Sequence, residues 1–414
     1  MNLAANKKVY NYVTLAYWVF MFADGALRML VLLHFHMIGF GAIQIAFLFS
    51  LYEVAGVITN LTAGWIGSRF GLSSILYTGI VIQILTISLL SQFGEVSTEV
   101  LYLIQIMILQ GASGIAKDLV KVSAKSSIKF LSPNQPSKLF KWVSYLTGSK
   151  NVIKGLGFFF GALSLGFLTF ETILIILVIL LIFTLLLTFK SVFFSLSKRK
   201  KNIKFSEVFS RNKSINILSL ARVFLFGARD TWFVVAVPLY FYSVGIENFF
   251  SIDQSGFLFV GGFMALWVIF YGVFQTTAPL IFQTFLNDES YIKKAAFKWS
   301  MLAFPIPLIL SCVLFLNPNA GIWVISWIIL GLFGFGFIFA MNSALHSYLV
   351  LSLSFNEEAP LDVGFYYMSN SVGRLIGTLL SGILYQLGGV SLCLLITSLM
   401  LIGSSLIVRK LSKA

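Results

Sequence analysis

Charged residues and cysteines are scarce in this sequence of 414 residues, and each scarcity excludes a class of protein. Only 11% of the residues are charged, against about a quarter in a soluble globular chain, so water is not the main solvent. The two cysteines, Cys312 and Cys393, lie in separate apolar runs, which excludes a disulfide framework. The first apolar stretch contains Asp24 and Arg28 without a cleavage site after it, so we expect a membrane span there and not a signal peptide.

Hydrophobic residues make up 58% of the chain and recur in runs long enough to cross a membrane. A helix needs about 20 residues to cross a hydrocarbon layer of about 30 Å. Length and polarity predict six spans in each half of the chain, at about residues 10–36, 41–66, 73–93, 98–121, 138–166 and 168–191, and then 215–243, 256–285, 294–316, 320–349, 361–386 and 389–408. The predicted fold is an all-α membrane protein with twelve transmembrane helices.

The lysines and arginines of the predicted loops fall on one side of the membrane. They occur at Lys7 and Lys8, at Arg69, from Lys125 to Lys141, in the segment 198–213, from Lys293 to Lys298, and from Arg409 to Lys413. The opposite loops contain acidic residues but no lysine or arginine. Because basic loops stay in the cytoplasm, we expect both termini to be cytoplasmic. This topology accounts for part of the net charge of +14, and no soluble basic domain remains that would bind nucleic acid.

The two halves of the sequence resemble each other. The matching segments are Phe20–Gly25 with Phe224–Arg229, Gly56–Ile58 with Gly272–Phe274, and Lys154–Gly157 with Arg374–Gly377. Together with the equal span counts, they predict two six-helix bundles at 1–192 and 215–414, joined by a basic cytoplasmic linker at 193–214. This arrangement resembles that of major facilitator transporters, whose substrate site lies between the halves.

The loop from Gly64 to Gly71 is similar to the signature loop of the same superfamily. Ser68 stands where that signature has an aspartate, so the salt bridge proposed for that loop lacks its acid at this position in this chain.

Ionisable residues within the predicted spans are the main candidates for a functional site, because a charge inside a membrane is costly. They are Asp24, Arg28, Glu53, Lys150, Lys154, Arg222, Arg229, Asp230 and Arg374, with Lys117, Asp118 and Lys121 near the end of the fourth span. Cations outnumber acids in this set. Since ammonium and guanidinium groups suit phosphate and carboxylate oxygens, the set predicts an anionic substrate.

Several of these charges also have a structural interpretation. Asp24 and Arg28 are four residues apart, which suits a pair within one helix. Lys125 and Lys129 continue the lysine spacing of the fourth span and are interpreted as anchors at the cytoplasmic surface. Arg229 and Asp230 form either a neutralised pair between helices or part of the site.

Four groups of residues resemble the organoarsenical efflux permease (ArsJ) family, a branch of the major facilitator superfamily. They are Asp24–His36, Ser113–Leu119 with Ser123–Lys129, Leu146–Asn151 with Lys154–Gly155, and Leu225–Asp230 with Trp232–Ala236. The resemblance runs from the first span to about the ninth. It implies a bacterial inner membrane protein that exports 1-arseno-3-phosphoglycerate and confers arsenate resistance. A partner glyceraldehyde-3-phosphate dehydrogenase would make this substrate from arsenate.

The combined hypothesis is a monomeric protein that transports its substrate by alternating access around a basic cavity. We expect no cofactor, no metal and no enzymatic activity. The expected substrate-binding residues are Arg28, Lys117, Lys121, Lys150, Lys154, Arg229 and Arg374. The acids Asp24, Glu53, Asp118 and Asp230 would balance this charge, and one of them would carry any coupling proton. The alternatives are an importer or phosphate antiporter of a phosphorylated metabolite, a multidrug proton antiporter, and a membrane scaffold without transport activity.

Overall fold

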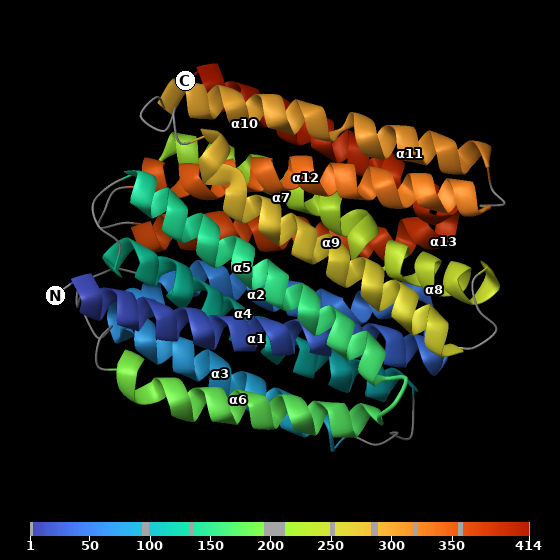
Figure 1. Cartoon of the computed structure of the whole chain (residues 1–414), viewed down its shortest axis with the longest axis horizontal. Helices are drawn as coiled ribbons and strands as arrows, with labels where there is room; N and C mark the ends of the chain where they lie inside the picture. Colours follow the sequence, from blue (N-terminus) through green and yellow to red (C-terminus); the bar gives the residue numbers. More distant parts are fainter. Residues whose placement is uncertain are drawn as a thin grey trace.

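The computed structural model describes residues 3–92, 99–131, 136–193, 212–248, 253–282, 289–317, 321–354 and 359–413. The regular structure in these ranges is entirely α-helical, and long helices run side by side in a bundle (Figure 1). The helices are α1 (Leu3–Met37), α2 (Ala42–Phe70), α3 (Leu72–Leu90), α4 (Glu99–Leu131), α5 (Pro136–Ser164), α6 (Phe170–Phe193), α7 (Lys213–Phe233), α8 (Ala236–Asn248), α9 (Asp253–Phe282), α10 (Glu289–Ala303), α11 (Pro305–Leu316), α12 (Ile322–Leu353) and α13 (Ala359–Lys413).

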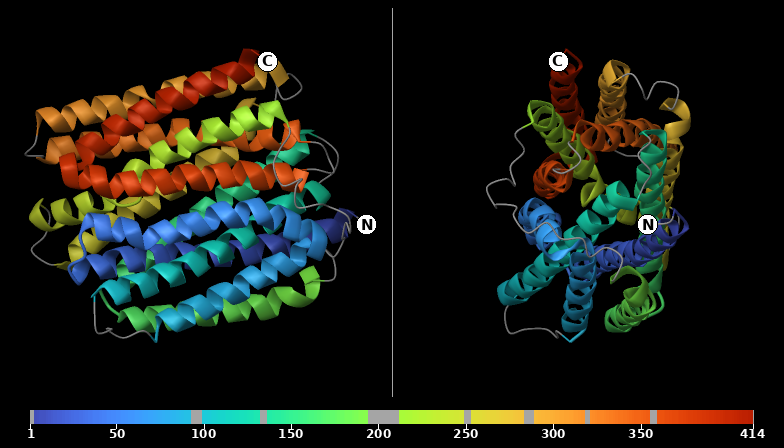
Figure 2. Two further views of the ribbon diagram at one scale, coloured as in Figure 1. Left: turned by 180° about the vertical axis from the view of Figure 1, so that it is seen from behind. Right: turned by 90° about the vertical axis from the view of Figure 1, so that its left-hand side faces the viewer.

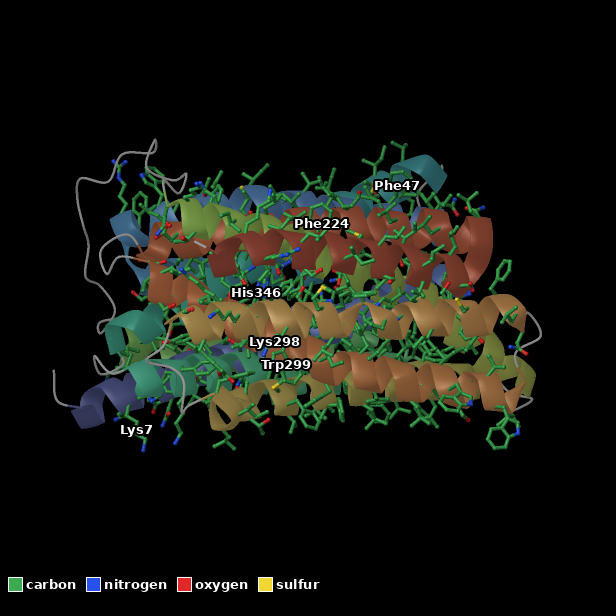
Figure 3. All side chains as sticks on the ribbon, turned by 90° about the horizontal axis from the view of Figure 1, so that it is seen from above. Lys7, Phe47, Phe224, Lys298, Trp299 and His346 are labelled. Carbon is green, nitrogen blue, oxygen red and sulfur yellow. The ribbon has the colours of Figure 1, made fainter. Side chains whose placement is uncertain are left out.

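The bundle exposes apolar side chains to its surroundings. Nine helical segments of the described ranges are long and apolar enough to cross a membrane. On α6, Phe183 and Leu186 are 63% and 70% exposed, and Phe47 of α2 also points outward, whereas His346 lies inside the bundle (Figure 3). Because such a surface is stable in lipid and not in water, the protein is a multi-pass membrane protein, which confirms the expectation from composition.

The helical backbone is interrupted at three places, and the hydrophobic pattern predicts only the third, at the boundary between the expected spans 361–386 and 389–408. The predicted span 215–243 is split into α7 and α8, and the hydroxyl of Ser381 accepts hydrogen bonds from the backbone N–H groups of Val235 and Ala236 at this break, at 3.2 and 3.0 Å. Phe304 separates α10 from α11, and Pro305 opens the second of them. Within α13 the backbone leaves the helical conformation at Gly388 and at Gly389, whose φ of 62° favours glycine.

Two extensive contacts join the first six helices to the later ones. Helix α2 packs on α13, and α5 packs on α9. Glycine allows both close approaches: a Cβ at Gly148 would lie 2.5 Å from the carbonyl oxygen of Gly272, and a Cβ at Gly364 would lie 2.8 Å from that of Asn60. Small residues at such crossings are the usual way in which membrane helices approach closely.

Both ends of the chain lie at the same end of the bundle (Figures 1 and 2). Most of the predicted linker, residues 194–211, lies outside the described residues. Near the end of the predicted linker, the side chain of Asn212 caps α7 by accepting hydrogen bonds from the N–H groups of Ser214 and Ile215.

Candidate substrate cavity

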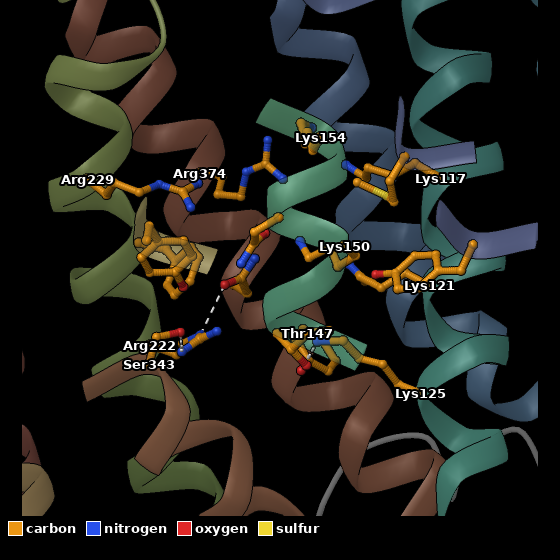
Figure 4. Close-up of a pocket in the computed structure, with 17 residues that line it drawn as sticks. Lys117, Lys121, Lys125, Thr147, Lys150, Lys154, Arg222, Arg229, Ser343 and Arg374 are labelled. Carbon is orange, nitrogen blue, oxygen red and sulfur yellow. Dashed lines mark hydrogen bonds between the residues drawn. The ribbon is translucent and has the colours of Figure 1, made fainter. Parts of the chain in front are cut away.

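A cavity lies in the middle of the bundle, between helices from both parts of the chain (Figure 4). The empty space within and at the opening of the cavity amounts to about 590 Å³, which includes a part open to solvent. Its lining residues are Tyr17, Met21, Lys117, Lys121, Lys125, Thr147, Lys150, Asn151, Lys154, Arg222, Phe226, Arg229, Tyr271, Ser343, Tyr367, Asn370 and Arg374. Eight of these described residues are lysines or arginines, and none is an aspartate or glutamate.

Most of the cations expected to bind substrate meet at this cavity. Lys117, Lys121, Lys150, Lys154, Arg229 and Arg374 line it, although they come from four different helices. Arg28 is not among the lining residues. Its guanidinium lies 4.9 Å from the centre of the Phe49 ring and 5.3 Å from that of Tyr52, and it contacts Glu53 at 3.5 Å.

The four predicted acids lie behind the cavity wall and are each at most 2% exposed. Asp24 accepts hydrogen bonds from the ammonium of Lys154 and the hydroxyl of Tyr52, both at 2.5 Å. Asp118 pairs with Lys121 and, at 3.5 Å, with Lys117.

The interpretation of Asp24 and Arg28 as a pair within one helix is wrong. Asp24 is bound from α5 by Lys154, and Arg28 is bound to Glu53 of α2. The spacing of four residues places the two side chains on one side of α1. It does not tell whether each side chain forms its ion pair within α1 or with a residue of another helix.

A chain of ion pairs connects the two parts of the molecule. Glu53 of α2 contacts Arg374 of α13 at 2.5 Å, and Arg374 also donates to Asp230 of α7 at 3.0 Å. Asp230 in turn contacts Arg229 at 2.5 Å. Arg28 joins the other end of this chain through Glu53. Arg229 and Asp230 are thus a neutralised pair that also binds a second helix.

The same acid–base arrangement occurs in both parts of the chain. Asp24 of α1 pairs with Lys154 of α5, and Asp230 of α7 pairs with Arg374 of α13. Close helix packing accompanies each pair, because Gly157 of α5 lies against α1 and Gly377 of α13 lies against α7. The bases and glycines of these pairs, but not the two aspartates, belong to the matching sequence segments Lys154–Gly157 and Arg374–Gly377.

Three lining cations have no acidic partner among the described residues. Lys125 donates a hydrogen bond to the hydroxyl of Tyr367. Arg222 donates to Asn370 at 3.1 Å and to Ser343 at 3.2 Å. For Lys150, the described residues provide neither a hydrogen bond nor an ion pair.

The interpretation of Lys125 as a surface anchor is wrong. It lines the cavity and is only 8% exposed. The physical reason is the length of α4, which continues to Leu131, whereas the apolar pattern ends the span near residue 121. The side chain of Lys129 lies outside the described residues.

The expected binding set does not include Arg222, and it does not include the neutral residues of the cavity. Arg222 lies two helical turns before Arg229 on α7, so helical spacing was a signal that both face the same side. Tyr17, Tyr271, Asn370 and the other neutral residues had no comparable signal. A second missed feature is on α12, where the buried side chains of Asn342 and His346 have no hydrogen-bond partner among the described residues.

No protein-family model and no curated protein matches this sequence. Several solved transporters have the same fold. The human organic anion transporter MFSD10 (TETRAN) is 14% identical, with a TM-score of 0.69 over 97% of this chain and 99% of that chain. A bacterial homologue of the iron transporter ferroportin, in an outward-facing state, is 12% identical, with a TM-score of 0.72 over 98% and 100%.

A third solved structure carries the superfamily's name. The major facilitator superfamily proton:xylose symporter XylE, bound to 6-bromo-6-deoxy-D-glucose, is 13% identical to this chain, with a TM-score of 0.72 over 99% of this chain and 96% of that chain. The chain therefore has the fold of major facilitator superfamily transporters. At these identities the likeness concerns the fold alone, and the substrate has to be argued from the cavity.

Proposed function

We propose that the protein is a secondary transporter that exports an organic oxyanion, 1-arseno-3-phosphoglycerate, by alternating access through the basic cavity. The observation that carries this proposal is the lining, in which eight cations and no acid among the described residues face one space. A cationic or neutral drug would gain nothing from such a lining. Ammonium and guanidinium groups instead bind phosphate and other oxyanions strongly.

The charge balance supports a substrate with two anionic groups. The eight lining cations and Arg28 are opposed by Asp24, Glu53, Asp118 and Asp230, which leaves five positive charges in excess. The proposed substrate carries an arsenate group and a phosphate group at its two ends. The membrane potential, which is negative inside, would favour its outward movement by about 2.3 kcal/mol per charge per 100 mV.

We also propose twelve spans, with both termini in the cytoplasm of a bacterium. Three observations support this count: α7 and α8 follow each other after two residues, α10 and α11 after one, and α13 bends at Gly388 and Gly389. Exposed basic residues, Lys7 and Arg409 among them, lie near the two chain ends, which is typical of the cytoplasmic side.

The proposed division is a bundle at 1–192, a linker at 193–214 and a bundle at 215–414. The repeated acid–base pairs Asp24–Lys154 and Asp230–Arg374 support it, because each pair lies within one of these bundles. Alternating access would then be a rocking of one bundle against the other around the cavity.

A phosphate antiporter or an importer of a phosphorylated metabolite remains the second candidate. The same basic lining supports it, because a phosphorylated metabolite presents the same oxygens. The multidrug alternative is disfavoured by a lining without acids, and a scaffold without transport activity gives no reason for eight cations to face one cavity.

The test is the accumulation of arsenic in arsenate-exposed bacterial cells that carry this protein, the partner dehydrogenase, both or neither. We expect lower cellular arsenic and arsenate resistance only when both are present. Lys150→Ala should abolish the effect, whereas Lys298→Ala, an exposed lysine of α10, is the matched control and should keep it. Equal arsenic in all four strains would refute the proposed substrate, and exchange with inorganic phosphate would favour the second candidate.

A further inference from the structure

The lining cations fall into two groups that differ in their partners. Lys117, Lys121, Lys154, Arg229 and Arg374 each contact an aspartate or glutamate. Lys125, Lys150 and Arg222, which we call the unpaired trio, have no acidic partner among the described residues. In the cavity, Arg229, Arg374, Lys154 and Lys117 lie at one end and Arg222 and Lys125 at the other, while Lys150 and Lys121, one from each group, lie between them (Figure 4).

We propose that the unpaired trio is the subsite that binds the phosphate or arsenate group of the substrate, and that the acid-paired cations hold the helices together instead. This inference rests on the proposed function and specifies where in the cavity it is carried out. It differs from the expectation from sequence, because it adds Lys125 and Arg222 and keeps only Lys150 of the expected binding set. The residues removed are those that contact an acid: Arg28, Lys117, Lys121, Lys154, Arg229 and Arg374.

The acid-paired cations are poorly suited to hold a substrate. Arg374 contacts two acids at once, Glu53 at 2.5 Å and Asp230 at 3.0 Å. An anion that approached Arg374 would have to displace these carboxylates or meet their negative charge. Separating a buried ion pair leaves an uncompensated charge in a medium of low dielectric constant, which opposes binding there.

Arg222 is held in place without being neutralised. Its guanidinium lies 3.8 Å from the centre of the Phe226 ring and 5.1 Å from that of Tyr366. Asn370 and Ser343 accept hydrogen bonds from its Nε and one Nη atom. Its partners are thus aromatic or neutral, so the orientation of the fork is fixed while its full positive charge remains for an oxyanion.

Lys125 and Lys150 complete the trio from the other part of the chain. Lys125 comes from α4 and its ammonium lies 4.0 Å from the centre of the Tyr367 ring, while Lys150 comes from α5. Arg222 comes from α7. An oxyanion bound by all three would therefore attract both proposed bundles at once, which would favour closure of the cavity around it.

Hydroxyl groups around the cavity give an independent indication of an oxygen-rich ligand. Tyr17 and Thr147 are lining residues, and their hydroxyls are buried and have no hydrogen-bond partner among the described residues. Tyr17 is 0% exposed and Thr147 is 6% exposed. A buried hydroxyl without a partner is costly, and a ligand with several acceptor oxygens would satisfy both.

Three positive charges together with neutral donors favour a tetrahedral group with two negative charges over a single carboxylate. The subsite should therefore distinguish a phosphate monoester from the same molecule without its phosphate. The comparison of 3-phosphoglycerate with glycerate tests this distinction, because the two compounds share the carboxylate and the carbon skeleton.

The experiment is calorimetric titration of the full-length protein in lipid nanodiscs with 3-phosphoglycerate and with glycerate. We expect wild type to bind 3-phosphoglycerate at least tenfold more tightly than glycerate. Lys125→Gln and Arg222→Gln should weaken 3-phosphoglycerate binding at least tenfold, and Arg222→Lys, which keeps the charge but not the fork, should lie between them and wild type.

Two further variants make the result decisive. Arg229→Gln should change the affinity less than either trio substitution, and the exposed Lys298→Gln should leave it unchanged. Thermal unfolding of each variant identifies any loss that reflects misfolding, in which case Arg222→Lys carries the test. If the trio variants bind 3-phosphoglycerate like wild type while Arg229→Gln loses binding, the assignment of the subsite to the trio is overturned. A wild-type protein that binds neither compound would instead refute the proposed oxyanion transport itself.

Discussion

Replacing Asp24 with asparagine should destabilise the protein strongly. Asp24 is 2% exposed, and its carboxylate receives hydrogen bonds from Lys154 and Tyr52, both at 2.5 Å. Asparagine has nearly the same shape and can still accept a hydrogen bond, but it leaves the ammonium of Lys154 buried without an acid. Removal of one member of a buried pair typically costs about 3–5 kcal/mol.

We expect Asp24→Asn to lie near the lower end of this range, at about 3 kcal/mol, because the amide oxygen still accepts a hydrogen bond. This corresponds to roughly a hundredfold change in the ratio of folded to unfolded protein. In the double variant Asp24→Asn/Lys154→Met neither charge is left alone, so the two effects should not add. The expected coupling free energy is about 2 kcal/mol.

The assay is reversible unfolding of the purified protein in mixed detergent micelles, followed by tryptophan fluorescence. Glu171→Gln, which changes an exposed acid in the first turn of α6, is the control and should alter the free energy of unfolding by less than about 0.5 kcal/mol. A double variant whose loss equals the sum of the two single losses would refute the reasoning, as would an Asp24→Asn protein as stable as wild type.

Three more predictions follow from the helix contacts and the cavity. Gly148→Leu should reduce transport at least about tenfold, because its side chain would meet the backbone of α9 at Gly272; initial transport rates in proteoliposomes check this. Arg374→Lys keeps the charge but lacks the fork that contacts Glu53 and Asp230 together, so we expect about a tenfold lower transport rate in the same assay. Replacing both Cys312 and Cys393 with serine should leave arsenate resistance within about twofold in a growth assay, because neither cysteine lines the cavity; a sensitive strain would indicate thiolate chemistry.

The sequence was sufficient to predict an all-helical membrane protein and most of the charges that face inward. Long apolar runs identify membrane spans because the hydrocarbon thickness sets their length. The cost of an isolated charge in lipid identifies the inward residues, and six of the seven expected cations line the cavity.

The pairing of these charges was not predictable in the same way. Helical spacing tells which residues share a face of one helix, but the partner of Asp24 depends on how α1 packs against α5. The misinterpretation of Lys125 has a related cause, since α4 extends beyond its apolar run and remains packed in the bundle. The break between α7 and α8 is also a tertiary effect, because the hydroxyl of Ser381 from α13 accepts from the backbone there.

The most direct test of the central claim is arsenic uptake by everted membrane vesicles that contain the protein. The vesicles are supplied with arsenate, glyceraldehyde-3-phosphate, NAD and the purified dehydrogenase, and the arsenic retained inside is measured. Our account predicts retention with the complete mixture and with wild-type protein, and none when the dehydrogenase is omitted or when Lys150 is replaced with alanine. Equal arsenic in vesicles with and without the protein, or undiminished uptake by Lys150→Ala, would contradict export of an organic oxyanion through the basic cavity.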